Sequence, residues 1–395
     1  MSEASAIVVP KGVRASGVKA GVKPSGGLDL ALIVADVPCS AVGTFTTNRV
    51  CAAPVKWCRE IVPTDSARAV VGNAGNANAA TGARGEADAR RTAEDAAALL
   101  GCKPHQVLVA STGVIGHHLP MDRIEAGLRA AAPALSTAPA SFHAAAEAIL
   151  TTDTHTKIVS HARDGWTLLG MAKGAAMIGP RMATMLAFLV TDARIPSATL
   201  QPILSEAVEE SFNCLSVEGH ASTNDTVLLL ASGLAGEELS GQALEHFAAA
   251  LKDACQTLAQ AMAADGEGST HFITIDVEGC ADREEARTLA RAVADSPLVK
   301  TAIHGADPNW GRIVSAAGYA GVPFEERELS LGINGVRVYD HGAPTDFDAN
   351  ALSAELRAHR DVHLRLHLKR GTASIRFWTC DLTAEYVRLN ADYTT

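Results

Sequence analysis

Periodic and alternating apolar positions predict a chain that mixes helices and strands. In Leu200–Phe212 the apolar residues recur every three to four positions, which is typical of an amphipathic helix with one buried face. Gln242–Ala264 carries a longer stripe of the same kind. His271–Val277 alternates apolar and polar residues instead, which predicts a strand. Weaker patterns predict strands at Leu28–Val37 and Gln106–Ala110, and helices at Glu86–Leu100, Ser141–Leu150 (with Ser141 as N-cap) and Glu284–Ala294.

The pattern changes after residue 285, where short strands become more frequent. Val362–Leu368 and Thr372–Trp378 flank an Arg-Gly pair and are typical of a hairpin. The strands and helices come in uneven groups, which disfavours a Rossmann fold or a regular barrel. We therefore expect an α/β protein with a large domain over residues 1–285 and a smaller α+β domain over 286–395. Two further short strands are predicted at Glu328–Ile333 and Val336–Tyr339.

Composition and charge exclude several classes of protein. The 395 residues are 47% hydrophobic, enough for a large core, and the net charge is -10 without a Lys/Arg cluster. Nucleic-acid binding is therefore not expected. No apolar run reaches the roughly 18 residues that a membrane crossing needs, and Met182–Val190 is short. The first 21 residues lack the apolar core of a signal peptide, so we expect a cytoplasmic protein whose eight cysteines are buried free thiols. No pair has the CxxC spacing, and no metal site is predicted.

On the residues alone, the candidate chemistry stays open. Lys173–Leu186 is a glycine-rich stretch that leads into an apolar strand, in which Thr184 fits as an ordinary strand residue. The stretch lacks the GxxxxGK[ST] pattern of a phosphate-binding loop. Ser111-Thr112-Gly113 fits a simple turn after a strand. Lys173 and Glu267 fit solvated loop positions.

The same stretch closely resembles the KGxxMIxPxMATML signature of the ornithine acetyltransferase (ArgJ) family. Other segments resemble that family's motifs in the same order, and together they cover essentially the whole chain. These segments are FTTN with AAPV at 45–55, NAGNANA with TG at 73–82, STGVIG at 111–116, TTDT at 151–154, STNDT at 222–226, DGEG at 265–268, KTA with DPNWGR at 300–312 and NADYTT at 390–395.

The resemblance implies an αββα sandwich of the DmpA/ArgJ-like type and a chain that cuts itself between Ala183 and Thr184. Thr184 would then be the nucleophile, with Thr112 and Gly113 forming the oxyanion hole. The polar contacts to substrate would come from Thr151, Lys173, Thr184, Glu267, Asn390 and Thr395.

The implied reaction moves an acetyl group from N2-acetyl-L-ornithine to L-glutamate by a ping-pong route through acetyl-threonine, in arginine biosynthesis. No cofactor is expected, although some members of the family also use acetyl-CoA as a donor. The implied assembly is an α2β2 heterotetramer of the pieces 1–183 and 184–395.

Two departures from the family pattern bear on substrate preference. Ala175 and Ala176 follow Gly174 where the family usually has Ser-Gly, and His220 interrupts a segment that is often Asp-Gly-Asp-Thr. A self-cleaving aminopeptidase or amidase of the same layout, with water as acceptor, is the alternative enzyme. A relative without activity is disfavoured by the intact MATML string.

Overall fold

The computed structural model describes residues 7–163, 165–179 and 185–392. Within these ranges the chain forms two sheets, one with eight strands and one with six. The first sheet consists of β1 Val13–Val18, β2 Leu30–Phe45, β3 Thr64–Asn76, β4 Val107–Val114, β5 Lys157–Arg163, β6 Trp166–Lys173, β7 Leu186–Thr191 and β8 Thr226–Ala231. Its helices are α1 Ala53–Ile61, α2 Gly82–Leu100, α3 Met121–Ala131, α4 Pro139–Ala148, α5 Ser197–Glu209 and α6 Gly241–Ala264.

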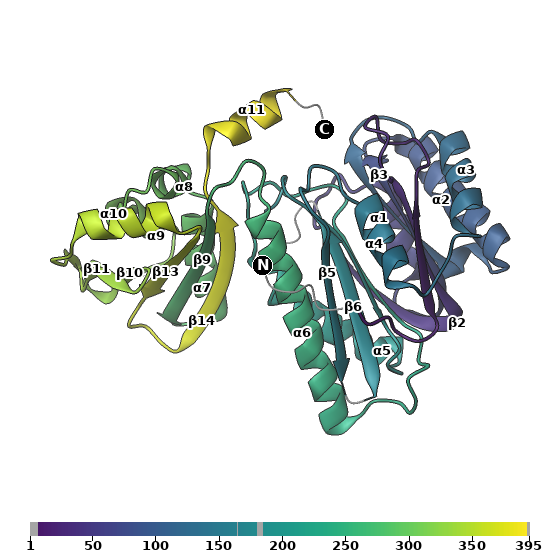
Figure 1. The fold of residues 1–395 in the computed structure, drawn as a ribbon. Coiled ribbons are helices and arrows are strands. Elements are labelled where there is room, and N and C mark those ends of the chain that lie inside the picture. The colour runs from purple at the N-terminus through teal and green to yellow at the C-terminus, as the bar shows by residue number, and fades with distance from the viewer. Residues whose placement is uncertain (1–6, 164, 180–184, 393–395) are drawn as a thin grey trace.

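The long strand β2 folds the first sheet into two facing halves. Residues 30–34 of β2 pair with β3, and residues 40–45 pair with β8. Cys39 and Ala41 also pair with β3, after shifts in the register. Exposed Pro38 lies at this change, where its missing N–H removes one ladder hydrogen bond. One half therefore holds β1 to β4 and the other holds β5 to β8 (Figure 1).

Alternating side chains of these strands build three apolar layers. Between the halves, Ile33 and Leu108 are buried together with Leu169 and Phe188 of the opposite half. Successive side chains of a strand point to opposite faces of the sheet, so Leu32 lies on the outer face of the first half. There it packs with α2 and α3. The other outer face packs against α5 and α6. The order of layers is thus α, β, β, α, which confirms the expected fold class.

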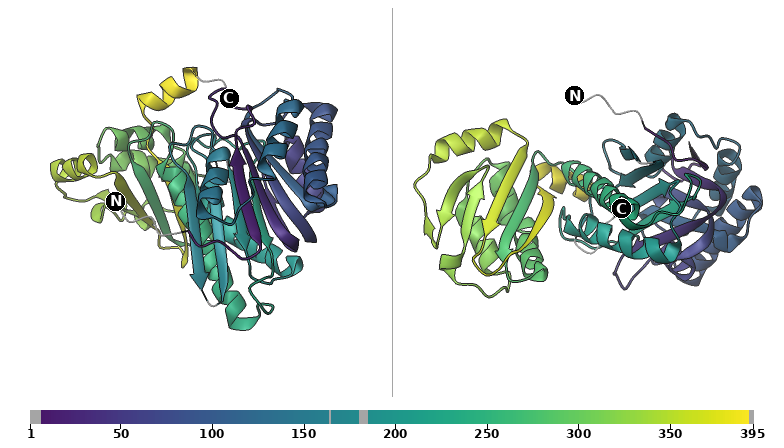
Figure 2. Two further views of the ribbon diagram at one scale, coloured as in Figure 1. Left: turned by 45° about the vertical axis from the view of Figure 1, so that its right-hand side comes forward. Right: turned by 90° about the horizontal axis from the view of Figure 1, so that it is seen from below.

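The second sheet lies beside α6, as the two views in Figure 2 show. Its strands follow the order β12-β11-β10-β13-β9-β14. They span β9 Phe272–Cys280, β10 Ser330–Ile333, β11 Val336–Asp340, β12 Ala343–Pro344, β13 Asp361–His367 and β14 Ala373–Cys380. The helices here are α7 Arg283–Ala294, α8 Pro297–His304, α9 Trp310–Gly318, α10 Ala349–Ala358 and α11 Ala384–Asp392. Because β9 belongs to this sheet, the sheet begins before the boundary expected at residue 285.

The predicted hairpin at residues 362–378 is wrong. Strands β13 and β14 do not pair with each other, because β9 lies between them and pairs with both. The Arg-Gly turn instead crosses the end of β9, with the backbone N–H groups of Arg370 and Gly371 donating to the Gly279 carbonyl at 2.9 and 3.0 Å. The pairing of each strand with β9, which is distant in sequence, thus replaces the local pairing that the turn pattern predicted.

The predicted helices are confirmed, with small changes at their ends. α2, α5, α6 and α7 all cover the expected segments. Helix α4 begins earlier than expected, at Pro139, so Ala138 and not Ser141 is its N-cap. Proline is favoured at the first helical position because its fixed φ already suits the helix.

Two expectations about cysteines and membranes can be compared with the structure. All eight cysteines are free thiols, and Cys51 and Cys102 are partly exposed while the other six are buried. In the part of the chain that the structure describes, no helix has both the length and the apolar character that crossing a bilayer requires.

Candidate active site

Several strands of the first sheet begin or end at one edge, and the candidate residues gather there. Lys173 is the last residue of β6 and pairs with Leu186, the first residue of β7. Leu186 in turn pairs with Thr226 at the start of β8. Residues 174–185 join β6 to β7, and Met185 lies directly before Leu186 at this edge. Ala183 and Thr184 themselves lie outside the described residues.

A cavity of about 350 Å³ opens at this edge and brings together six of the residues expected from the sequence. These six are Thr112, Gly113, Thr151, Lys173, Glu267 and Asn390. They come from β4, the loop before β5, the end of β6, the loop after α6, and α11, so distant segments of the chain converge. Thr395 lies outside the described residues.

The local pattern predicted a turn at Thr112 and Gly113. In the structure both residues instead belong to strand β4. Gly113 has φ of +129°, and a Cβ on it would lie 2.4 Å from the carbonyl carbon of Gly75. Only glycine fits this close approach of two backbones without strain. On the other side, the buried Asn224 amide donates to the carbonyl of Ser111 at 2.8 Å. The backbone of this segment is therefore fixed from two directions.

Lys173 is a buried cation at the cavity wall. Its side chain is 1% exposed, and its Nζ donates to the hydroxyl of Thr151 at 3.3 Å. Burial lowers the pKa of Lys173 to about 8, although the carboxylates of Asp153 and Asp225 oppose the shift. Asp153 is held by Lys157 at 2.7 Å and by the Gly174 N–H at 2.6 Å. The Lys173 ammonium is therefore placed to pair with an anion in the cavity.

Glu267 connects the tail of the chain to the segment after Lys173. Its backbone N–H donates to the Ala175 carbonyl at 2.9 Å. Its carboxylate accepts from the side-chain amide of Asn390 at 2.9 Å, although Asn390 is exposed. This contact places α11 over the loop that follows α6 (Figure 1). The cavity thus carries an acidic group and a basic group from different segments of the chain.

Three polar residues of this edge were not predicted from the sequence: Lys23, Asn224 and Asp225. Lys23 lines the cavity, and burial lowers its pKa. Asp225 is fully buried and accepts from the Met185 N–H at 3.1 Å, one residue after Thr184. Burial raises the pKa of Asp225 to about 7. The pattern that could have revealed Asn224 and Asp225 is their position as polar residues directly before the apolar strand β8.

The residues that depart from the family pattern differ in their position relative to the cavity. Ala176 lines the cavity, and Ala175 is buried beside it. His220 is exposed and is not among the residues of the cavity. The pair of alanines therefore bears on the shape of the site.

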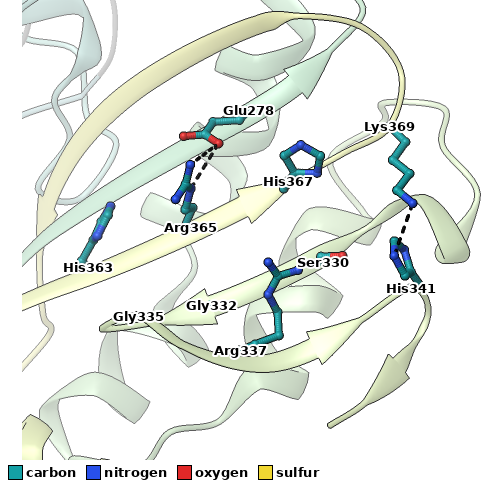
Figure 3. Close-up of a pocket in the computed structure, with 10 residues that line it drawn as sticks. All are labelled: Glu278, Ser330, Gly332, Gly335, Arg337, His341, His363, Arg365, His367 and Lys369. Carbon is teal, nitrogen blue, oxygen red and sulfur yellow. Dashed lines mark hydrogen bonds and ion pairs between the residues drawn. The ribbon is translucent and has the colours of Figure 1, made fainter.

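A second cavity, of about 430 Å³, lies on the second sheet and contains none of the residues expected from the sequence (Figure 3). It is lined by basic side chains, but Arg365 pairs with Glu278 at 2.8 Å and Arg337 pairs with Asp340 at 2.8 Å. Much of its charge is therefore already balanced. The cavity at the sheet edge is the better candidate for chemistry.

Comparison with known proteins identifies the family of the chain. The family model described as the ArgJ family matches residues 14–395. A relative from Rhodopirellula baltica, named arginine biosynthesis bifunctional protein ArgJ, is 45% identical over 98% of this chain and 97% of its own length. The chain therefore belongs to the ArgJ family. It is an acyltransferase of that family.

Two solved structures align with about half of the chain. The arginine biosynthesis bifunctional protein ArgJ from Bacillus halodurans is 40% identical, covers 51% of this chain and 96% of its own chain, and has a TM-score of 0.50. Ornithine acetyltransferase from Mycobacterium tuberculosis, complexed with ornithine, is 45% identical over 43% of this chain and 92% of its own, with a TM-score of 0.42.

Proposed function

We propose that the protein transfers an acetyl group from N2-acetyl-L-ornithine to L-glutamate, with Thr184 as the nucleophile after cleavage of the Ala183–Thr184 bond. The observation that carries this proposal is the cavity at the start of β7, where Thr112, Gly113, Lys173 and Glu267 meet. The relatives named for arginine biosynthesis support the same pathway.

Cleavage would prepare the nucleophile as well as cut the chain. The Thr184 hydroxyl attacks the carbonyl carbon of Ala183, and the acyl group moves from nitrogen to oxygen. Water then opens the resulting ester, leaving a carboxylate on Ala183 and a free α-amine on Thr184. A threonine hydroxyl needs a base to attack near pH 7, and an α-amine has an unperturbed pKa of about 7.7–8.0. The new amine can therefore accept the hydroxyl proton during acetyl transfer.

Acetyl transfer would follow in two halves through one ester. The Thr184 oxygen attacks the acetyl carbon of acetylornithine, and ornithine leaves with the proton returned by the amine. The α-amine of glutamate then attacks the acetyl ester and releases Thr184. Both halves form a tetrahedral oxyanion, which donors at Thr112 and Gly113 would stabilise. One such donor contributes about 2.7–4 kcal/mol to lowering the barrier.

The charges of the cavity match those of the two amino acids. Lys173 suits a substrate carboxylate, and Glu267 suits the side-chain ammonium of acetylornithine. Lys23 supplies a second ammonium at the cavity wall, and glutamate has two carboxylates. This arrangement favours an amino-acid acceptor over water, which needs no charged partner.

The cleaved pieces 1–183 and 184–395 would remain together in an α2β2 assembly. On either side of the cut, all of β7 is paired with residues 168–173 of β6, so cleavage would leave the sheet intact. The Bacillus halodurans chain supports a cut of this kind, because almost all of that chain aligns with only half of this one.

The assay that tests the proposal follows acetylglutamate formation from acetylornithine, with glutamate present or replaced by water alone. Fast transfer that depends on glutamate is expected. Release of free acetate at the same rate without glutamate would instead identify an amidase. Because the relatives are named bifunctional, acetyl-CoA is tested as a second donor in the same assay.

The pH dependence should show the titration of Lys173. Its ammonium is present below a pKa of about 8 and is lost as the pH rises through that value. We therefore expect KM for acetylornithine to increase above pH 8, by up to tenfold per pH unit. The check is KM measured from pH 6.5 to 9.5 for wild type and Lys173→Met. The variant should have a high KM at every pH; an unchanged alkaline rise in the variant would assign that rise to another group.

Glu267→Gln should weaken the binding of acetylornithine. Glutamine retains an oxygen for the Asn390 amide but removes the negative charge. A charge-assisted hydrogen bond contributes about 1.5–3 kcal/mol, so KM should rise by roughly 10–100-fold while cleavage of the chain proceeds normally. Glu245→Gln, on the exposed side of α6, is the matched control. Equal KM values for the two variants would remove Glu267 from the substrate contacts.

A further inference from the structure

Two histidines and one aspartate around the second sheet converge outside the cavity described above. His271 precedes β9, His304 ends α8, and Asp381 follows β14. The Nδ1 atoms of His271 and His304 lie 3.0 and 3.2 Å from the same oxygen, Oδ2 of Asp381. None of the three lines the catalytic cavity. We propose that these three side chains bind a divalent transition-metal ion with the ligand preference of zinc.

The distances fit a coordination polyhedron. Zinc binds imidazole nitrogen and carboxylate oxygen at about 2.0–2.2 Å, which separates the ligand atoms of a tetrahedron by roughly 3.3–3.5 Å. The distances of 3.0 and 3.2 Å from the two Nδ1 atoms to Oδ2 of Asp381 are close to that edge. All three ligand atoms lie within 4.8 Å of one another. A small movement of the side chains would open the centre to a metal ion.

The hydrogen bond on the far side of His271 orients its free nitrogen toward this centre. Its Nε2 lies 3.0 Å from the carbonyl oxygen of Leu356, which can only accept. Nε2 must therefore carry the proton, and in the neutral ring Nδ1 offers a lone pair. That lone pair faces an oxygen of the Asp381 carboxylate, so a cation between them would relieve the repulsion. Bonds from metal-binding histidines to a backbone carbonyl are the usual way in which the ring is fixed.

Thr270 adds a fourth polar atom to the centre. Its hydroxyl lies 3.0 Å from Nδ1 of His271 and 3.2 Å from Nδ1 of His304. It also donates its single proton to Asp381, so it has no proton left to donate to either imidazole nitrogen. His304 is half-exposed, whereas Asp381 is fully buried. A metal ion could thus enter from solvent, and the hydroxyl or a water molecule could complete four ligands.

The chemistry of the ligands selects the kind of ion. Imidazole nitrogens suit zinc, copper, nickel and iron, whereas calcium and magnesium prefer sites built from oxygen. The bound ion would connect the start of β9 to the ends of α8 and β14. Asp381 lies three residues before α11, the helix that carries Asn390 to the catalytic cavity. The site would therefore steady the segment leading to that helix.

The test uses the full chain without an affinity tag of histidines, stripped of metal with a chelator and titrated with Co²⁺ and then Zn²⁺. Wild type should bind one Co²⁺ per chain with the visible bands of a four-coordinate ion, and Zn²⁺ should displace it and raise the melting temperature. His304→Gln keeps a hydrogen-bond donor beside Asp381 but removes the imidazole. It should lower the affinity by more than the roughly 10–100-fold that loss of an outer partner costs.

His363→Ala is the matched control, because His363 makes a single 2.8 Å contact with Asp276 in the same sheet. It should bind Co²⁺ as tightly as wild type. Equal affinity of wild type and His304→Gln, or no stoichiometric binding by wild type, would overturn the proposal. In that case the three side chains would form only a hydrogen-bonded cluster that joins β9, α8 and β14. Neither outcome depends on acetyltransferase activity.

Discussion

Thr184→Ala is expected to give a single uncut chain of 395 residues and to abolish acetyl transfer. The substitution removes the hydroxyl that would attack both Ala183 and the acetyl donor. Loss of a catalytic nucleophile costs on the order of 10⁶-fold in kcat. The intact mass of the denatured protein reports cleavage, and the assay with acetylornithine and glutamate reports transfer.

Thr184→Ser is the matched variant, since it keeps the hydroxyl and removes only a methyl group. It should still cut itself, although more slowly, and should retain measurable transfer. Two fragments in the Thr184→Ala protein would place the cut elsewhere. An uncut wild-type chain after prolonged incubation would mean that maturation does not occur, and the proposal would then lose its nucleophile.

Gly113→Ala is expected to lower kcat by roughly 10²–10³-fold, the cost of losing one oxyanion donor. The new Cβ would lie 2.4 Å from the backbone of Gly75, and φ is +129°. The backbone of β4 must therefore move, and the donors at Thr112 and Gly113 move with it. KM should change much less than kcat, because the oxyanion exists only in the transition state and intermediate.

Gly116→Ala separates this effect from backbone strain. Gly116 also has positive φ, +84°, but nothing lies within 4 Å of its added Cβ. Both variants should unfold at lower temperature than wild type, by an amount that reflects a strained backbone of about 1–3 kcal/mol. Only Gly113→Ala should lower kcat by roughly 10²–10³-fold. Wild-type kcat in Gly113→Ala would remove this segment from the oxyanion hole.

Local patterns predicted the helices well because each helix buries one continuous stripe. The spacing of Phe247, Leu251 and Leu258 on α6 matches the residues that pack in the core. The strand β2 was predicted only to residue 37, since exposed Pro38 interrupts its pattern. The structure continues it to Phe45 in a different pairing. Which strand lies beside which was not readable locally, as the position of β9 between β13 and β14 shows.

The candidate site was predictable only through ordered motifs. Lys173 and Glu267 have no local pattern that distinguishes them from solvated loop residues, yet one is buried and both line a single cavity. Lys23 was missed because its loop resembles no catalytic motif. Its place at the cavity follows from the packing of residues 22 and 23 against Gly75. The cluster of His271, His304 and Asp381 was missed for the same reason, since its members lie 33 and 77 residues apart in sequence.

The central claim is that the acetyl group rests on Thr184 between donor and acceptor. The most direct test mixes the cleaved enzyme with acetylornithine alone, quenches it in acid, and measures the mass of the fragment 184–395. One added acetyl group, located on Thr184 and removed when glutamate is supplied, is the predicted result. A fragment that never carries acetyl, while acetylglutamate still forms at full rate, would contradict the account, because transfer would then be direct.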